Sequence, residues 1–298
     1  MNSEFEFDQE FFSAARRGLR SLPEQEQNEI KAFVENSLND DGYFCDESGQ
    51  EDLYISSFGV LLVSLLGIDK NADALSAYLR SKGDGEGLDF LHVISLARAW
   101  RFYSHDSLEI GSYSKIAEKI EYNRCSDLLW NQAKGTHFGS VYGTFLAIAA
   151  YQDLGLSIPE EAKLAAGMKV LKCKDGAYGT DKASEYSTTP ATAFAVLILN
   201  FLEESYDFQL SWLLKQQHFD GGFLAVSQMP FSDVQSTVYA IMALAASESE
   251  ELSKIAPKAK EFLMSMKVEG GFRGHQKESK SGIENTIFAL AGLGFLGK

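Results

Sequence analysis

One unit occurs three times in the C-terminal half of the chain, and it limits what the chain can fold into. The copies align without gaps: DGAYGTDKASEYSTTPATAFAVLIL from Asp175, DGGFLAVSQMPFSDVQSTVYAIMAL from Asp220 and EGGFRGHQKESKSGIENTIFALAGL from Glu269. In each copy an acid–glycine pair opens the unit, and a threonine follows sixteen residues after that glycine. The threonines, at positions 192, 237 and 286, lie 45 and 49 residues apart. This period leaves room for two helices and their loops.

Fainter copies of the unit lie upstream. SVYGTFLAIAAY around Thr144 matches DVQSTVYAIMAL position by position, and DDGYFCDESGQEDLYISSFGVLL from Asp40 keeps the acid–glycine opening. GDGEGLDFLHVISLARAW from Gly83 supplies a further copy. Residues 1–20 predict an N-terminal helix outside the repeats. Six units of about fifty residues account for the rest of the chain, approximately at residues 21–67, 68–103, 110–153, 157–203, 205–247 and 249–298.

Each unit predicts a helical hairpin. The helix after the threonine is apolar nearly all round, which is typical of a helix packed on both sides. The other helix is amphipathic: in the first unit Ile30, Val34 and Leu38 share one face and charged residues cover the other. Strand patterns are scarce. Six such hairpins bury both kinds of helix only if the apolar helices form an inner ring. The sequence therefore predicts a single all-α domain, an alpha-alpha toroid ((α/α)6 barrel) with about twelve principal helices.

All inner helices of such a ring point the same way, so their N-terminal ends gather at one mouth. Residues within about one turn of those ends should converge there. The candidate cavity-mouth residues are Tyr54, Tyr142, Gln235 and Tyr239, and the candidate catalytic residues are the acids Glu284 and Asp233. Partial exclusion of water would raise the pKa of Glu284 and suit it to general acid catalysis. The plainer alternative is that the helix dipole favours an acid at this helix start.

Composition excludes several classes of protein. With 42 acidic and 27 basic residues the net charge is −15, which argues against nucleic acid as a partner. The opening MNSEFEFDQEFF is acidic where a signal peptide is basic, and the apolar runs from Phe58 and Thr192 fall short of a membrane span. We therefore expect a cytoplasmic protein without a membrane span. Cys45, Cys125 and Cys173 lack the spacing of a disulfide framework or a zinc site.

The repeats resemble those of a known superfamily. QxxxGGF from Gln217, EGGFRG from Glu269 and the helix starts SDVQSTVYAIMAL and STTPATAFAVLIL are similar to repeats of protein prenyltransferase beta subunits and squalene or oxidosqualene cyclases. The resemblance covers residues 167–298 and, less clearly, 34–66. It implies an alpha-alpha toroid with a central apolar cavity, lined partly by aromatic side chains, for an isoprenoid or similar lipid substrate.

The resemblance also allows a comparison of cyclase residues. Class II cyclases protonate their substrate with the middle Asp of a DxDDTA motif. Here the matching segment begins at Asp233, and Gln235, an amide without an acidic proton, takes the place of the donor. In the last unit Glu284 stands at the equivalent place and resembles the single acid of oxidosqualene cyclases. If the chain is a cyclase, the acid that protonates the substrate is therefore Glu284 or Asp233.

The prenyltransferase sites are compared in the same way. The seats of their zinc-binding Asp, Cys and His fall on Val234, Ser236 and Asn285, so we expect no metal site and no zinc-dependent thiol prenylation. No cofactor is indicated. The unit that supplies diphosphate-binding residues in those enzymes corresponds to a locally basic loop. Its candidate diphosphate-binding residues are Arg273, His275, Lys277 and Lys280.

Three classes of function remain open from the sequence. The first is an enzyme that acts on an isoprenoid or another long apolar molecule, either as a cyclase or as a zinc-independent prenyl transferase. The second is a noncatalytic toroid that binds a lipid or a protein partner. The third is a carbohydrate-active barrel of six hairpins, which needs paired carboxylates across the mouth. For that pair the candidates are Asp52, Asp233 and Glu284.

Overall fold

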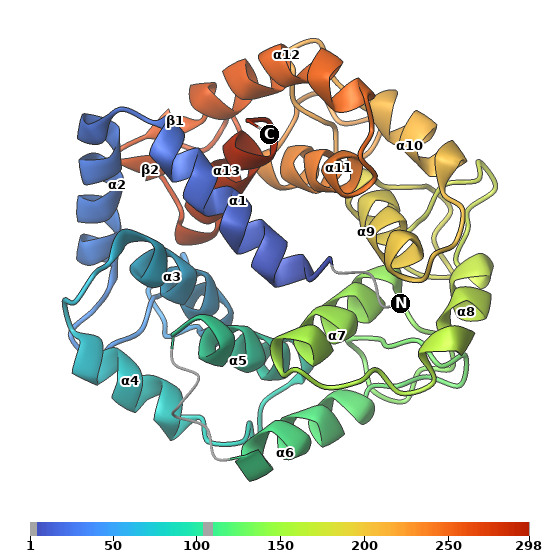
Figure 1. Ribbon diagram of the computed structural model, residues 1–298, viewed down its shortest axis with the longest axis horizontal. Coiled ribbons are helices and arrows are strands. Elements are labelled where there is room, and N and C mark those ends of the chain that lie inside the picture. Colours follow the sequence, from blue (N-terminus) through green and yellow to red (C-terminus); the bar gives the residue numbers. More distant parts are fainter. Residues whose placement is uncertain (1–4, 104–109, 298) are drawn as a thin grey trace.

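The computed structural model describes residues 5–103 and 110–297, which form two concentric rings of helices (Figure 1). The inner ring consists of α3 (Leu53–Leu66), α5 (Phe90–Tyr103), α7 (Val141–Asp153), α9 (Thr189–Phe201), α11 (Val234–Ala246) and α13 (Ile283–Phe295). The outer ring consists of α2 (Glu24–Ser37), α4 (Ala72–Ser81), α6 (Ile110–Glu121), α8 (Leu164–Val170), α10 (Asp207–Leu214) and α12 (Glu251–Ser265). Each outer helix precedes its inner partner in the chain. The prediction of an all-α toroid of six hairpins is confirmed.

Regular structure beyond these helices is sparse in the described residues. A 3-10 turn, η2 (Glu161–Lys163), precedes α8. Two short strands, β1 (Lys267–Val268) and β2 (Gly271–Phe272), form an antiparallel pair before α13. None of the described helices has the length and apolar character that crossing a bilayer requires.

The recurring threonine joins each loop to its inner helix. In the fifth unit Thr237 is buried; its hydroxyl donates to the carbonyl of Asp233 at 2.7 Å and accepts from the backbone N–H of Phe223 at 2.8 Å. The same bond to a loop N–H recurs at Thr192 with 3.1 Å and at Thr286 with 3.0 Å. A buried loop N–H needs a partner. The threonine spacing in the sequence therefore reflects a hydrogen bond that fixes each loop against the ring.

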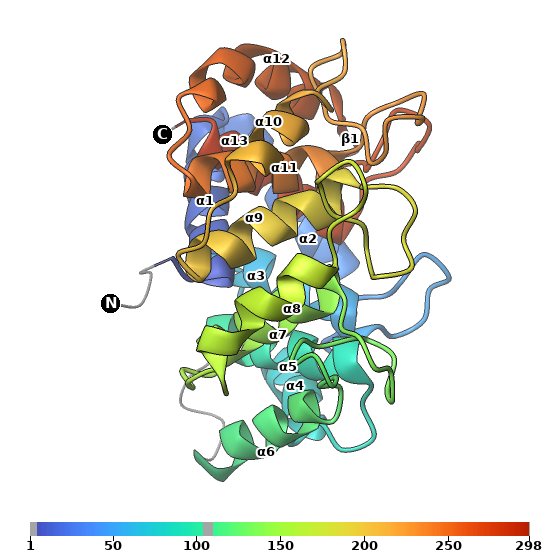
Figure 2. The same cartoon turned by 90° about the vertical axis from the view of Figure 1, so that its right-hand side faces the viewer.

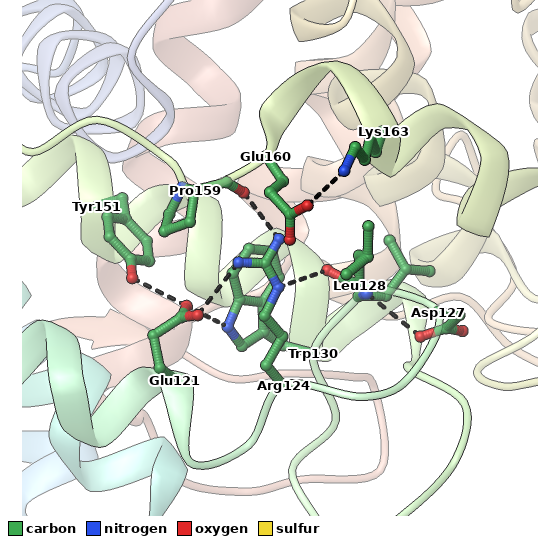
Figure 3. Close-up of polar contacts among 10 residues, drawn as sticks. Glu121, Arg124, Asp127, Leu128, Trp130, Tyr151, Pro159, Glu160 and Lys163 are labelled. Atoms are coloured by element: carbon green, nitrogen blue, oxygen red, sulfur yellow. Dashed lines mark hydrogen bonds and ion pairs between the residues drawn. The ribbon is translucent and has the colours of Figure 1, made fainter.

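The outer ring is short at α8, and a polar cluster holds the loop that precedes it (Figure 3). Arg124 donates through Nη2 to the carbonyl of Pro159 at 2.7 Å, and its Nη1 lies 3.1 Å from Glu121 Oε2. Glu121 Oε1 also accepts from Trp130 Nε1 at 3.1 Å and from the Tyr151 hydroxyl at 2.9 Å. These groups satisfy one another, so the cluster stabilises the third and fourth units.

A helix from outside the repeats occupies the ring. Helix α1 (Phe7–Ser21) crosses the ring in Figure 1 and, in Figure 2, lies towards the face opposite the long loops. Phe7, Phe11 and Phe12 are buried. The ring of Phe7 stacks on Phe145 with centroids 4.9 Å apart, and Phe11 meets the edge of Phe288 at 5.0 Å.

The resemblance led us to expect a central cavity large enough for an isoprenoid, but the cavity in the structure is small because α1 fills most of the ring. The cavity left between α1 and the inner helices has a volume of about 30 Å³, about a tenth of that of a small ligand pocket of about 300 Å³. The ring is apolar and aromatic as expected. Because α1 brings its own phenylalanines into the ring, the described structure has no room there for an isoprenoid chain while α1 is docked.

The C-terminal half of α1 packs against α13 with the two backbones in contact. A Cβ atom at Gly294 would lie 1.7 Å from the carbonyl oxygen of Ala14, and one at Gly18 would lie 1.8 Å from that of Leu290. Arg17 Nε also donates to the carbonyl of Gly294 at 3.2 Å. Only glycine allows this approach of the first helix to the last.

We expect Gly294→Ala to lower the free energy of unfolding by about 3 kcal/mol, because the new methyl group forces the two helices apart. Urea denaturation measures this loss. Gly297→Ala is the matched control, because its Cβ would meet nothing nearer than the Leu293 carbonyl oxygen at 3.6 Å. Equal stability of the two variants would contradict the close packing of α1 on α13.

Candidate functional site

The loops that precede the inner helices project from one face of the toroid, on the right-hand side of Figure 2, and this face is the mouth. There Tyr54 donates a short hydrogen bond through its hydroxyl to Glu284 Oε1. The side chain of Gln235 also interacts with Glu284, and Tyr142 interacts with Tyr54. The ring of Tyr239 meets that of Phe194 edge-on at 4.4 Å. Residues from the first, third, fifth and sixth units thus come together.

Burial dominates the electrostatics of Glu284. Desolvation raises the pKa of its carboxyl above the ordinary value, while the Tyr54 hydrogen bond, the charge of Arg98 and the Gln235 hydrogen bond lower it by less. The pKa of Tyr54 is raised too, first by burial and then by the proximity of Tyr142 and Glu284. The mouth therefore holds an acid that keeps its proton to higher pH than a solvated glutamate does.

The second candidate acid is engaged in capping a helix. Asp233 precedes α11, and its Oδ1 accepts the backbone N–H of Ser236 at 2.7 Å. Burial raises the pKa of Asp233, although the hydrogen bonds from Ser236 oppose this. Asp52 caps α3 in the same way, with its Oδ1 2.7 Å from the N–H of Ile55. Both carboxylates thus stabilise helix starts, as N-caps commonly do.

The candidate diphosphate loop is tied together internally by Glu278. The carbonyl of Glu278 accepts from Arg273 Nη1 at 3.0 Å, and its Oε1 lies 3.1 Å from His275 Nε2. Lys277 and Lys280 are exposed, and Lys277 Nζ lies 4.6 Å from the centroid of the Phe231 ring. Glu278 therefore offsets part of the positive charge that a diphosphate would use.

The residues compared above with the zinc ligands of prenyltransferases are Val234, Ser236 and Asn285. Val234 and Ser236 are buried in the first turn of α11, and Asn285 is partly buried at the start of α13 beside Gly274. Within residues 5–103 and 110–297, no three His, Cys, Asp or Glu side chains lie in an arrangement that could hold a metal ion.

Sequence reasoning missed a charged cluster inside the ring. Arg98, on α5, is 5% exposed, and its Nε lies 2.8 Å from Oδ2 of Asp8 on α1, which is 8% exposed. The guanidinium also lies 4.8 Å from the centroid of the Phe58 ring. Arg98 and Asp8 line the small cavity together with Tyr54, Tyr142 and other mouth residues. The signal was an arginine within the otherwise apolar run VISLARAW.

A second carboxyl group adjoins this ion pair. Asp153, at the end of α7, is 8% exposed, and its Oδ2 has no hydrogen-bond partner among the described residues. Burial raises the pKa of Asp153 well above its ordinary value, and the neighbouring Asp8 raises it further. Arg98 and Arg101 oppose this rise. The cluster accordingly places two carboxyl groups near the guanidinium of Arg98.

The raised pKa of Glu284 predicts a pH-dependent stability difference. In the folded protein the carboxyl binds its proton more tightly than in the unfolded chain, so its contribution to stability is complete below pH about 4.5 and is lost as pH rises through the folded pKa. Glu284→Gln cannot titrate. Its free energy of unfolding should therefore rise relative to that of the native protein as pH increases above about 4.5, in urea titrations from pH 4 to 8.

Tyr54→Phe tests the hydrogen bond that opposes the rise in the pKa of Glu284. It removes the hydrogen bond that lowers the pKa of Glu284, so the pH range over which the stability is lost should move upward. A difference between Glu284→Gln and the native protein that stays constant with pH would contradict the environment described for Glu284.

Solved structures with the same architecture include two that bind isoprenoids. Candida albicans protein geranylgeranyltransferase-I complexed with GGPP is 14% identical, with a TM-score of 0.61 over 96% of this chain and 90% of that one. A Scytonema type II terpene cyclase in complex with its substrate, geranylgeranyl dihydroxybenzoate, is 11% identical, with a TM-score of 0.61 over 95% and 97%. At these identities the likeness shows the fold alone.

A carbohydrate enzyme shares the fold as well. The unsaturated glucuronyl hydrolase of Bacillus sp. GL1 is 13% identical, with a TM-score of 0.58 over 96% of each chain. No curated protein matches this sequence significantly. The family model described as the prenyltransferase alpha-alpha toroid domain matches residues 115–298, which is more than half of the chain. The chain therefore belongs to the prenyltransferase alpha-alpha toroid family.

Proposed function

We propose that this chain is a noncatalytic toroid that binds an isoprenoid or a similar apolar chain inside its ring, in competition with the N-terminal turns of α1. The observation that carries the proposal is the way α1 fills the ring. Phe7 and Phe11 lie against Phe145 and Phe288 of the inner helices, as an apolar chain in the same place would. The isoprenoid compounds in the geranylgeranyltransferase and terpene cyclase structures support this ligand class.

The free energy gained by burying an isoprenoid chain in the ring is comparable with the free energy lost when Phe7 and Phe11 leave it. Burial of a phenylalanine side chain is worth about 1.5–3 kcal/mol, so withdrawal of Phe7 and Phe11 costs about 3–6 kcal/mol. Loss of the buried Asp8–Arg98 ion pair adds to this cost. A chain of about fifteen carbons gains at most about 12 kcal/mol from burial, at about 0.8 kcal/mol for each methylene. Loss of translational and rotational freedom takes back at least about 4 kcal/mol. We therefore expect weak binding that improves when α1 is less firmly docked.

The residues at the catalytic positions support a noncatalytic role. Gln235 stands where cyclases have the proton donor, and an amide has no acidic proton to give to an alkene. Asp233 is engaged as the cap of α11. Val234 and Ser236 stand at zinc seats that need a carboxylate and a thiolate. Binding without turnover uses the ring and needs none of these groups.

A second candidate function rests on Glu284. Its carboxyl has a raised pKa and is oriented by Tyr54, so it could act as a general acid on a small polar substrate at the mouth. The basic loop, with Arg273, His275 and Lys277, would then contact an anionic part of that substrate. Glu284→Gln should abolish such an activity while leaving farnesol binding in the ring unchanged.

Farnesol, a C15 isoprenoid alcohol, is the probe for the main proposal. Isothermal titration calorimetry should show one farnesol per chain, bound at least tenfold more tightly by the double variant Phe7→Ala/Phe11→Ala than by the native protein. The variant weakens only the occupant that competes with the ligand. Phe219→Ala removes a phenylalanine that is 84% exposed and should leave the affinity unchanged.

Hydrogen exchange distinguishes displacement of α1 from binding elsewhere. If farnesol takes the place of the first turns of α1, amide exchange in residues 7–12 should accelerate when farnesol is added. The proposal would be refuted if both proteins bound neither farnesol nor farnesoic acid, its carboxylic acid counterpart, or if the isoprenoid were converted to a product.

A further inference from the structure

The buried charge inside the ring belongs to an ion pair formed between α5 and α1. Arg98 is nearly inaccessible to solvent, and its closest anionic partner is Asp8, at 2.8 Å. Burial lowers the pKa of Arg98, but the charge and hydrogen bond of Asp8, together with the charges of Asp153 and Tyr54, raise it by more, so the guanidinium stays charged. Phe58 covers one side of the guanidinium at 4.8 Å. The ring wall thus contains a fixed cation whose counter-ion is carried by the helix that fills the ring.

The first turns of α1 place one carboxylate, that of Asp8, next to apolar aromatic rings, as a fatty acid places its carboxylate next to its chain. Asp8 and Phe11 are three residues apart and share a helix face, and both line the same small cavity. Phe7 adds a second ring that is fully buried. Seen from the inner helices, the first turns of α1 consist of one carboxylate and an apolar group of aromatic rings.

If these turns of α1 are displaced, the Arg98 guanidinium loses the carboxylate of Asp8. An uncharged chain supplies no anion to replace it. A charged guanidinium that loses its partner at this depth is strongly unfavourable. A ligand that brings a carboxylate restores the ion pair, and a ligand that brings a hydroxyl does not. Asp153 is the other acid facing Arg98; burial and the neighbouring Asp8 raise its pKa, and its Oδ2 has no hydrogen-bond partner among the described residues. Glu6 is paired with Arg101 at 3.4 Å, on the half-exposed side of α5.

We propose that the ligand of this toroid is a carboxylate-bearing isoprenoid or acyl chain, whose carboxylate pairs with Arg98 in the place of Asp8 and whose tail replaces Phe7 and Phe11. This inference rests on the proposed function, because it assumes that the ring accepts a chain. It adds the headgroup, which the fold and the neighbouring structures leave open. It also places that headgroup beside Arg98 in the ring cavity, whose lining residues do not include Lys277 or Lys280.

The test compares farnesoic acid with farnesol, which share one chain and differ in the headgroup. Calorimetry on the full chain should give at least tenfold tighter binding of the acid. Asp8→Asn, which removes the competing carboxylate, should strengthen binding of the acid at least tenfold and change binding of the alcohol little. The double variant Asp8→Asn/Arg98→Gln, which has neither charge, should bind the two compounds equally.

Glu6→Gln is the control, because it breaks a different ion pair between α1 and α5 and should leave the preference for the acid intact. If Asp8→Asn does not fold, the thermal shift of the native protein gives the same comparison: the acid should raise Tm by several degrees more than the alcohol. Equal binding of acid and alcohol by the native protein would overturn the headgroup assignment, because Asp153 would then have replaced Asp8, and would leave the proposed function standing. Binding of neither compound would overturn both.

Discussion

The hydrogen bond between each repeat threonine and the loop before it underlies the rest of the structure. It occupies a buried loop N–H that would otherwise be unsatisfied, and it holds the loop against the first turn of the inner helix. In the first unit Ser56 takes the same role and accepts the N–H of Phe44 at 2.9 Å. Within the described residues, five of the six units make this hydrogen bond, with the second unit as the exception. It places the starts of those inner helices alike, so the side chains beside them face one mouth.

The sequence was sufficient to predict the toroid because the information was repeated. Six copies of one pattern, each with an apolar and an amphipathic helix, admit few arrangements, and local periodicity identifies both kinds of helix. The position of α1 was not predictable in this way. Phe7, Phe11 and Phe12 form an ordinary apolar helix face, and nothing local in the sequence distinguishes a helix that covers a ring from one that enters it. The pairing of Asp8 with Arg98, ninety positions later, is equally invisible to periodicity.

The candidate site also has one part that the sequence predicts and one part that it does not. The convergence of Tyr54, Tyr142, Gln235 and Glu284 followed from topology, because all four stand near inner-helix starts. Which of the acids is available for chemistry depended on side-chain partners. Asp233 caps α11 through Ser236, and Glu278 occupies Arg273 and His275. These contacts join residues that are close in the sequence. Whether their side chains meet depends on the path of the loop backbone, which a residue pattern alone does not reveal.

The contact of α1 with α13 has a consequence for the order of folding. Helix α1 packs most closely on α13, so five hairpins are synthesised before the α13 part of the surface that receives α1 exists. The ring closes at the same late moment, when Lys267 of the sixth unit meets Glu26 and Glu29 of the first at 3.1 and 2.9 Å. Until then Phe11 lacks Phe288, its ring partner on α13, whereas the ring partners of Phe7 and Phe12 lie on the earlier helices α7 and α5. Contacts of such long sequence separation form slowly, and unprotected apolar surface invites aggregation meanwhile. The docking of α1 on α13 is therefore expected to be among the last steps in the folding of this chain.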